Sequence, residues 1–289
     1  MKTRFILNPR SGTGQQANQA VQLRARVRGA EVRLTERPRH ATELARQAVA
    51  DGCELVVAVG GDGTINEIGS ALTGTNVTLG LVPCGSGNGL ARELGVWGSI
   101  TRALDILETG DDRIIDCGLA DGHPFFTVAG VGFEAVLADR FNRLKRRGFI
   151  RYLIHGANAL RHYRSEPMTI VQDADRDARN VFTLAVGNAA QYGNNAYIAP
   201  RARPDDGLLT LTAVPPLGPW RAPSLFWRLF ARTLDRSSTV LMRTGTRFVV
   251  ERAAPGLLHT DGEVYNAPAS VTFEVRPACL KVRGPALSR

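Results

Sequence analysis

Apolar runs and helical segments alternate over roughly the first 118 residues. The run at 54–59, ELVVAV, is apolar throughout, as expected of a parallel strand that is covered on both faces. Residues 40–50 place Leu44, Ala45 and Ala48 on one face of a helix. This alternation predicts a parallel sheet with helices on both sides. Further strands are predicted at 4–7, 31–34, 78–82 and 113–117, and further helices at 15–28, 65–72, 87–93 and 100–108.

The pattern changes after residue 119 to short strand-like segments separated by turns such as Gly193-Asn194-Asn195. Such spacing predicts an antiparallel β-sandwich. We therefore expect an α/β plus all-β protein, with a Rossmann-like parallel sheet at 1–118 and a sandwich at 119–276. Residues 277–289 are a candidate to return to the first domain. Strands are predicted at 125–129, 168–172, 181–186, 208–214, 247–251 and 270–275, and helices at 135–163 and about 224–234.

Composition narrows the class of protein only slightly. The 289 residues are 44% hydrophobic and carry a formal net charge of +9. No apolar run approaches the roughly 18 to 20 residues that cross a bilayer, and the N-terminal apolar stretch is too short for a signal peptide, so a cytoplasmic protein is expected. The four cysteines lack zinc-ligand spacing. Positive charge suits nucleic acid, anionic membranes or anionic substrates, and does not choose among them.

Three glycine-rich turns follow predicted strands of the first domain, at 8–14 (NPRSGTG), 60–64 (GGDGT) and 83–89 (PCGSGNG). The carboxyl ends of parallel strands share one edge of the sheet, where ligands bind. Glycines let backbone N–H groups approach an anion, and a following helix adds its positive end. The turns therefore predict a phosphate site, although any one alone is equally a tight strand-to-helix connection. Its hydroxyl donors would be Ser11, Thr13, Thr64 and Ser86.

Asp62 within GGDGT restricts the chemistry further. A carboxylate repels bare phosphate, so Asp62 predicts either Mg²⁺ between the two or contact with a reacting hydroxyl. Other nucleotide motifs are absent from the sequence: there is no GxxxxGK[ST] loop, and no HRD or DFG set. The glycines at 85, 87 and 89 have the wrong spacing for a dinucleotide fingerprint.

Taken together, these motifs resemble the diacylglycerol kinase catalytic domain superfamily, which includes bacterial lipid kinases and sphingosine kinases. The similarity continues through Pro204-Asp205-Asp206-Gly207-Leu208 and Asp261-Gly262-Glu263, so it covers nearly the whole chain. It implies an α/β ATP-binding domain, a β-sandwich lipid-binding domain, and ATP- and Mg²⁺-dependent phosphorylation of a lipid hydroxyl. A diacylglycerol-like acceptor is expected first, and a sphingoid base is the alternative.

The resemblance also implies roles for individual residues. Asp206 would hold Mg²⁺ with the backbone oxygens of Arg203 and Leu208. Glu263 would be the catalytic base, with Asp261 as its neighbour, or Asp62 would be the base as in sphingosine kinases. A simple Asp-Gly turn is the alternative for both the 205–207 and 261–263 segments. The residues expected around ATP are Asn8, Ser11, Gly12, Thr35, Gly60, Gly61, Asp62, Gly63, Thr64, Asn66, Gly85, Ser86 and Asn88.

One position departs from the diacylglycerol kinase pattern, because Gly89 stands where an Asp usually follows the Asn of the third loop. Sphingosine kinases also lack this Asp, which leaves the acceptor open. NAD kinase shares GGDGT and is a rival, but its Asn-Glu pair is not placed as Asn66-Glu67 is. A catalytically inactive nucleotide or lipid sensor is a further alternative. Nucleic-acid binding rests on charge alone and is not expected.

Two segments are candidates for contact with a membrane. Residues 140–151 combine six Arg and Lys side chains with apolar ones, which suits an anionic surface at the inner face of the membrane. The alternative is a solvated basic helix face. Aromatic residues form the second candidate, and their alternative is packing in the sandwich core. They are Trp220, Phe226, Trp227 and Phe230. A homodimer is left open.

Overall fold

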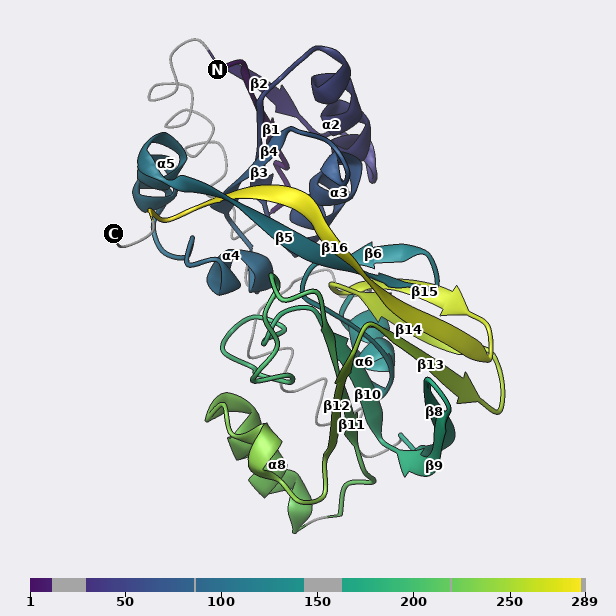
Figure 1. Ribbon diagram of the computed structural model, residues 1–289. Coiled ribbons are helices and arrows are strands. Elements are labelled where there is room, and N and C mark those ends of the chain that lie inside the picture. Colours follow the sequence, from purple (N-terminus) through teal and green to yellow (C-terminus); the bar gives the residue numbers. More distant parts are fainter. Residues whose placement is uncertain (12–29, 86, 143–162, 219, 287–289) are drawn as a thin grey trace. The chain divides into compact units, whose positions relative to one another are not determined.

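The computed structural model describes residues 1–11, 30–85, 87–142, 163–218 and 220–286 (Figure 1). The chain forms two compact units, Met1–Ile115 with Ala278–Arg289, and Asp116–Pro277. It passes from one unit to the other within two strands, β5 (Asp111–Ala120) and β16 (Ser270–Gly284). The predicted helix at 15–28 and most of the one at 135–163 lie outside the described residues.

A parallel sheet forms the centre of the first unit, in the order β2–β1–β3–β4, and β16 pairs beside β4 through Val282 and Leu79. Helices α2 and α3 lie on one side of it and α5 on the other (Figure 1). This confirms the predicted α/β class. The elements are β1 (Thr3–Leu7), β2 (Glu31–Leu34), α2 (His40–Ala50), β3 (Leu55–Gly60), α3 (Asp62–Leu72), β4 (Thr78–Pro83), α4 (Gly89–Glu93) and α5 (Ile100–Thr109).

The central strands of this sheet are apolar because helices cover both of their faces. Every residue of β3 is buried, as expected of a parallel strand with no solvent-facing side. Gly80 lets α5 approach β4 closely, since a Cβ there would lie 2.5 Å from Leu107 Cδ2. The continuous apolar run and the small residue thus together fix how closely the layers pack.

The second unit is an antiparallel β-sandwich, as predicted. One sheet has the order β12–β11–β10–β7–β14–β15. The other contains β9–β8–β13–β16, with β5 and β6 beyond β16. Buried side chains from both sheets, including Leu184 and Leu258 from one and Phe248 and Phe273 from the other, form a shared core.

The second unit also contains two longer helices and one short 3₁₀ turn in its described part, namely α6 (Phe133–Asn142), α8 (Arg221–Phe230) and η1 (Leu234–Arg236). None of the described helices has the length and apolarity needed to cross a bilayer. The strands are β6 (His123–Phe125), β7 (Val128–Gly132), β8 (Glu166–Gln172), β9 (Asp175–Val181), β10 (Thr183–Gly187), β11 (Leu209–Val214), β12 (Leu241–Gly245), β13 (Arg247–Arg252), β14 (Gly256–Thr260) and β15 (Glu263–Ala267).

Four strands, β9, β12, β14 and β15, were not predicted from the sequence. Three of them end a sheet, where one side of the strand is open and polar residues are tolerated, so their apolar signal is weak. β14 is internal but short, and turn residues flank it. The predicted strand at 125–129 was wrong in its continuity: it divides into β6 and β7, because the amides of Phe126 and Thr127 donate to Asp261 instead of to a neighbouring strand.

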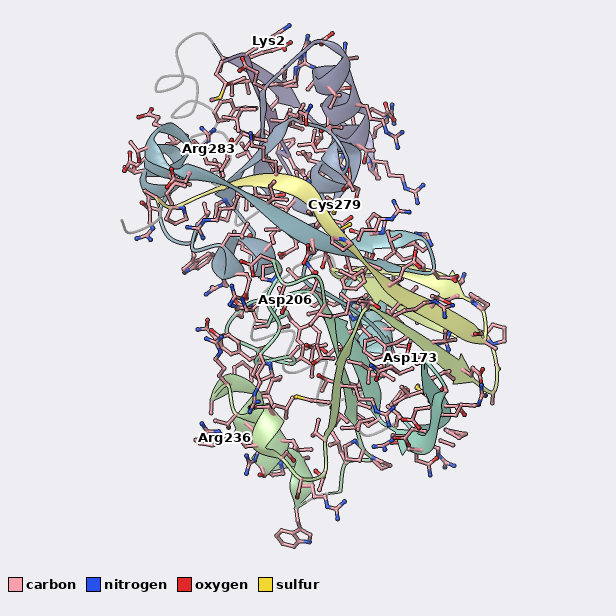
Figure 2. All side chains as sticks on the ribbon, in the orientation of Figure 1. Lys2, Asp173, Asp206, Arg236, Cys279 and Arg283 are labelled. Atoms are coloured by element: carbon pink, nitrogen blue, oxygen red, sulfur yellow. The ribbon has the colours of Figure 1, made fainter. Side chains whose placement is uncertain are left out.

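Side-chain contacts to Asp112 anchor the last part of β16 within the first unit. Arg283 Nε lies 2.7 Å from Asp112 Oδ1, and Lys281 Nζ lies 3.0 Å from Oδ2. Arg283 also donates to Leu107 O at 2.9 Å, which places it beside α5 (Figure 2). Burial alone would raise the pKa of Asp112, but the bonds from Arg283, Lys281 and Thr78 outweigh it and hold the pKa below its usual value.

We expect Arg283→Ala to lower the free energy of unfolding by about 1–3 kcal/mol, because a half-buried carboxylate loses its main partner. Lys281→Ala is the matched control and should cost less, since its side chain is more exposed. A lowered pKa stabilises the fold above the unfolded value and loses that contribution as pH falls. The difference between wild type and Arg283→Ala in urea melts should therefore shrink below about pH 4. Equal costs for the two variants at neutral pH would contradict the anchor.

Candidate functional site

The first two predicted loops are bonded to one another in the first unit. Asn8 N donates to Val59 O at 3.0 Å, and Asn8 Nδ2 donates to Thr64 Oγ1 at 3.1 Å. The hydroxyl of Ser11 accepts from Gly61 N at 3.3 Å. The structure therefore brings Asn8, Ser11, Gly61 and Thr64 together at the carboxyl ends of β1 and β3. Gly12, predicted at the same place, lies outside the described residues.

Asp62 joins the second loop to the third. Its carboxylate accepts the backbone N–H of Asn88 at 2.8 Å and that of Gly89 at 2.7 Å. These amides begin α4, and hydrogen bonds to an ionised acceptor are the stronger kind. The two loops also approach backbone to backbone, since a Cβ on Gly85 would lie 2.7 Å from Gly61 Cα. Glycine is therefore required at this crossing for steric reasons alone.

Asn88 shapes the third loop from inside. Its side chain is fully buried, and its backbone is left-handed at φ 51°. The side chain accepts from Gly85 N at 3.0 Å and donates to Gly85 O at 2.6 Å, so it closes the turn on itself. We expected Asn88 at the nucleotide, and this structural role was missed, although Asn is the residue that best tolerates such a backbone. Ser86, its neighbour in the loop, lies outside the described residues.

The start of α3 is the part of the site best suited to an anion. Gly61 precedes this eleven-residue helix and, as a glycine, makes no side-chain capping bond to the amides at its positive end. Gly60 lets Thr64 fold back over the turn, because a Cβ at Gly60 would lie 2.6 Å from Thr64 Oγ1. The hydroxyl and the helix amides thus lie on one turn, which is the usual arrangement for binding phosphate.

Three further residues occupy positions around these loops. Thr35 follows β2, and its amide donates to Leu7 O at 2.9 Å, next to the first loop. Asn66 is buried within α3 and accepts from Ser70 Oγ at 3.4 Å. Glu67 accepts from Ala41 N at 3.1 Å, so its carboxylate is engaged at the start of α2. That engagement weighs against a nucleoside-binding Asn66-Glu67 pair of the NAD kinase type.

In the second unit, the turn at 204–208 carries the predicted metal-binding residues. Buried Asp116 holds the turn, since its Oδ2 accepts Gly207 N at 2.7 Å and its amide donates to Pro204 O at 2.7 Å. Asp206 Oδ1 accepts Leu208 N at 3.0 Å, while the side chain of Arg203 pairs with Asp205 at 3.1 Å. The turn is therefore an Asp-Gly turn, and it is also acidic.

The chemistry of this turn fits a hard divalent cation. Partial desolvation of its carboxylate, with the nearby charges of Asp116 and Asp205, raises the pKa of Asp206 by more than its bond from Leu208 N and the charge of Arg203 lower it. Carboxylate and carbonyl oxygens are the donors that Mg²⁺ and Ca²⁺ prefer. The described residues contain no group of three or more His, Cys, Asp or Glu side chains placed to hold a metal. A cation at this turn would thus rely on few carboxylates, backbone oxygens and water.

Asp261 and Glu263 flank the tip of the β14–β15 hairpin. Asp261 has a left-handed backbone at φ 49°, and its carboxylate accepts the amides of Phe126 at 2.8 Å and Thr127 at 2.9 Å. Glu263 begins β15 and is exposed. The segment is therefore a turn, in which Asp261 is occupied by backbone amides while Glu263 faces solvent.

A buried polar cluster in the second unit was missed by sequence reasoning. Glu134 lies over Gly130, which pairs in register with His259 on β14. His259 Nε2 is 3.2 Å from Glu134 Oε1, and the Tyr192 hydroxyl donates to Oε2. Burial raises the pKa of Glu134, and His259 and Tyr192 oppose it. The one sequence signal was a Glu and a His inside apolar segments, VGFEAV and LLHT.

Comparison with known proteins settles the family. Residues 2–120 match the model of the diacylglycerol kinase catalytic domain, and residues 127–284 match the YegS C-terminal NAD kinase beta sandwich-like domain. A diacylglycerol kinase of Mycobacterium tuberculosis is 32% identical, over 98% of this chain and 95% of that protein. The chain belongs to the diacylglycerol kinase family. A probable YegS-like lipid kinase of Pseudomonas savastanoi is 30% identical, over 89% of this chain and 84% of the relative.

This membership confirms the predicted resemblance and the predicted class of enzyme, a lipid kinase. Solved structures support the fold alone. A putative diacylglycerol kinase from Bacillus anthracis aligns with a TM-score of 0.80 at 21% identity, over 98% of this chain and 96% of that one. An NAD kinase from Archaeoglobus fulgidus, solved in complex with ATP, aligns more distantly, with a TM-score of 0.53 at 13% identity, over 97% of this chain and 93% of that one.

We expect Gly130→Ala to destabilise this kinase by more than about 2 kcal/mol. A Cβ there would lie 1.4 Å from Glu134 Oε1 and 2.5 Å from Leu184 O, so the buried carboxylate or the strand must move. Gly218→Ala is the control, because a Cβ at Gly218 has nothing within 4 Å. Chemical unfolding of both variants measures the difference, and a Gly130→Ala protein as stable as the control would show that the cluster is not fixed as described.

Proposed function

We propose that this family member transfers the γ-phosphate of ATP to the hydroxyl of a diacylglycerol-like lipid, with Mg²⁺, at the cytoplasmic face of a membrane. The observation that carries the proposal is the joined set of loops at the carboxyl ends of β1, β3 and β4. There, Asn8, Ser11 and Thr64 lie around the start of α3, where the N-cap residue is a glycine without a side-chain capping bond. In a lipid kinase these groups would hold the phosphates of ATP in place, and phosphoryl transfer depends mainly on such positioning and on charge neutralisation.

On the ATP side, the chain itself supplies the binding groups. Phosphate oxygens would accept backbone N–H groups of Gly63 and Thr64 and the hydroxyl of Ser11. The negative charge of Asp62 would attract Mg²⁺ to the phosphates. Its carboxylate is held beside the same helix start by two amides of the third loop. Bound Mg²⁺ would supply the positive charge that lets this carboxylate and the phosphates lie close together.

On the acceptor side, we propose Glu263 as the group that removes the proton from the lipid hydroxyl. It is the exposed carboxylate of the β14–β15 hairpin, and a base must be reachable by its substrate. Asp261 would position it, because its bonds to the amides of Phe126 and Thr127 hold the tip of the hairpin. Asp62 is the alternative base, in the manner proposed for sphingosine kinases.

Gly89 bears on the choice of acceptor. Its amide is one of the two that Asp62 accepts, and it adds no carboxylate of its own at the third loop. This lack is shared with sphingosine kinases, so a sphingoid base is the second candidate acceptor. Phosphorylation of NAD is disfavoured because Glu67 is engaged at α2. An inactive sensor would bind ATP and phosphorylate no lipid.

The first test is transfer of radiolabelled phosphate from ATP to a panel of diacylglycerol, sphingoid base, ceramide, phosphatidylglycerol, polyprenol and NAD. We expect labelled diacylglycerol with wild type and a loss of more than about 100-fold with Asp62→Asn, because the charge beside the phosphates is removed. Magnesium-free ATP binding to the variant should fall far less than turnover, whereas a role limited to tying the loops together predicts parallel losses of stability, ATP affinity and turnover. An Asp62→Asn enzyme with near-normal turnover would refute the proposal.

The second test concerns the turn at 204–208. Asp206→Ala should raise the Mg²⁺ concentration needed for half-maximal activity several-fold, since the turn loses one of its carboxylate oxygen donors. Asp205→Ala is the matched control, because Asp205 pairs with the side chain of Arg203. Both residues are exposed, so neither change should unfold the chain. Identical Mg²⁺ dependence in the three proteins would exclude a metal at Asp206.

A further inference from the structure

Helix α8 displays its aromatic side chains to solvent instead of burying them. Trp220 is 92% exposed, Trp227 67% and Phe226 53%. In the described part of the second unit these are the only large apolar side chains with such exposure. Packing in the sandwich core, the alternative for these residues, is therefore wrong for all three. A cluster of large exposed apolar side chains indicates a binding surface, whereas single exposed apolar side chains are common on soluble proteins.

The helix has two apolar faces, of which one packs against its own unit and the other is exposed. Leu225 is buried, and Leu229 packs against the same apolar cluster on the outer face of the six-stranded sheet, so one face attaches α8 to its unit. With about 3.6 residues per turn, Trp220 and Trp227 lie above one another on the opposite face, next to Phe226. Phe226 in turn contacts Phe230, with ring centroids 5.0 Å apart. The exposed stripe of Trp220, Phe226 and Trp227 therefore contributes little to the buried core of its unit.

Positive charge borders this aromatic stripe. Arg221 and Arg228 lie on one edge of the helix, and residues 208–234 contain no Asp or Glu. Arg232 comes two residues after the end of the helix and contacts Pro200 O, and Arg236 lies beside α8 in the 3₁₀ turn (Figure 2). The nearby carboxylate of Asp235 is already paired with Arg201, at 2.8 Å. An aromatic stripe with a cationic edge is the pattern of helices that lie in the surface of an anionic bilayer.

We propose that α8 docks this protein onto an anionic lipid bilayer, with Trp220, Phe226 and Trp227 in the headgroup region and the arginines on lipid phosphates. Tryptophan favours that region because its ring is apolar with one polar N–H. The proposal rests on the proposed function only in that an enzyme acting on a lipid must reach the bilayer. A second copy of the chain is the less suitable occupant, because its own α8 offers the arginines no acidic partner.

The three tryptophans of the sequence make the docking directly measurable. In a Trp97→Phe background, only Trp220 and Trp227 report. We expect a blue shift of their emission and co-sedimentation with phosphatidylglycerol vesicles without ATP, weakened at high salt and on phosphatidylcholine vesicles. Trp220→Ala with Trp227→Ala should lower the partition coefficient by at least about tenfold. Arg221→Glu with Arg228→Glu should do likewise, whereas Arg247→Glu, an exposed arginine of β13, should have little effect.

Activity then separates docking from catalysis. The tryptophan variant should lose phosphorylation of vesicle-borne acceptor while keeping wild-type turnover on a short-chain acceptor that is monomeric in water. Failure of the proposed function would instead abolish turnover on both acceptors and leave vesicle binding unchanged. The docking proposal is overturned if the variants bind vesicles as wild type does, if wild type binds none, or if the tryptophan substitutions convert a dimer to a monomer in sedimentation analysis.

Discussion

The carboxylate of Asp62 is the contact on which the predicted nucleotide site depends. It accepts two backbone amides, from Asn88 and Gly89, across the gap between neighbouring strands. These two hydrogen bonds bring the second and third loops together. The backbones of Gly61 and Gly85 then lie so close that neither position has room for a side chain. Gly87 is subject to the same restriction, since a Cβ there would lie 2.8 Å from Asp62 Oδ2. One acidic side chain thus explains why glycine occupies three positions in two separate loops.

How much of this followed from the sequence depends on the distance over which each interaction acts. The parallel sheet, the glycine turns at the ends of its strands and most strands of the sandwich follow from local periodicity and turn residues, and these were predicted, whereas β9, β12, β14 and β15 were not. The partner of Asp62 was not, because it lies 26 residues away on the next strand connection. The Glu134–Tyr192 contact spans 58 residues and depends on the pairing of strands that no local pattern specifies. Motif reasoning predicted that the three loops share one edge of the sheet but could not assign the partners of their side chains.

In the six-stranded sheet of the second unit, successive side chains along each strand point to opposite faces, and the two faces have different roles. Leu184, Val186 and Leu258 point into the core shared with the other sheet. Residues between them in the ladder, such as Ala185 and His259, belong to the opposite face, where Glu134, Tyr192 and α8 are also found. The first face is mostly apolar, with buried Thr260 as a polar member, and serves stability. The second mixes apolar packing with buried charge and an exposed helix, a combination that stability alone does not require.

The route of β16 has a consequence for how the protein is made. Residues from Ala278 onward complete the first unit. Among them, Val282 pairs with Leu79 of β4, a residue that is synthesised 203 positions earlier (282 minus 79). On the ribosome, the edge of β4 therefore stays without its neighbour until the segment around Val282 has emerged. An apolar strand edge left open is a site of mispairing. The first unit to be translated is thus the last to be finished, and its earliest strands need protection while the sandwich is still being synthesised.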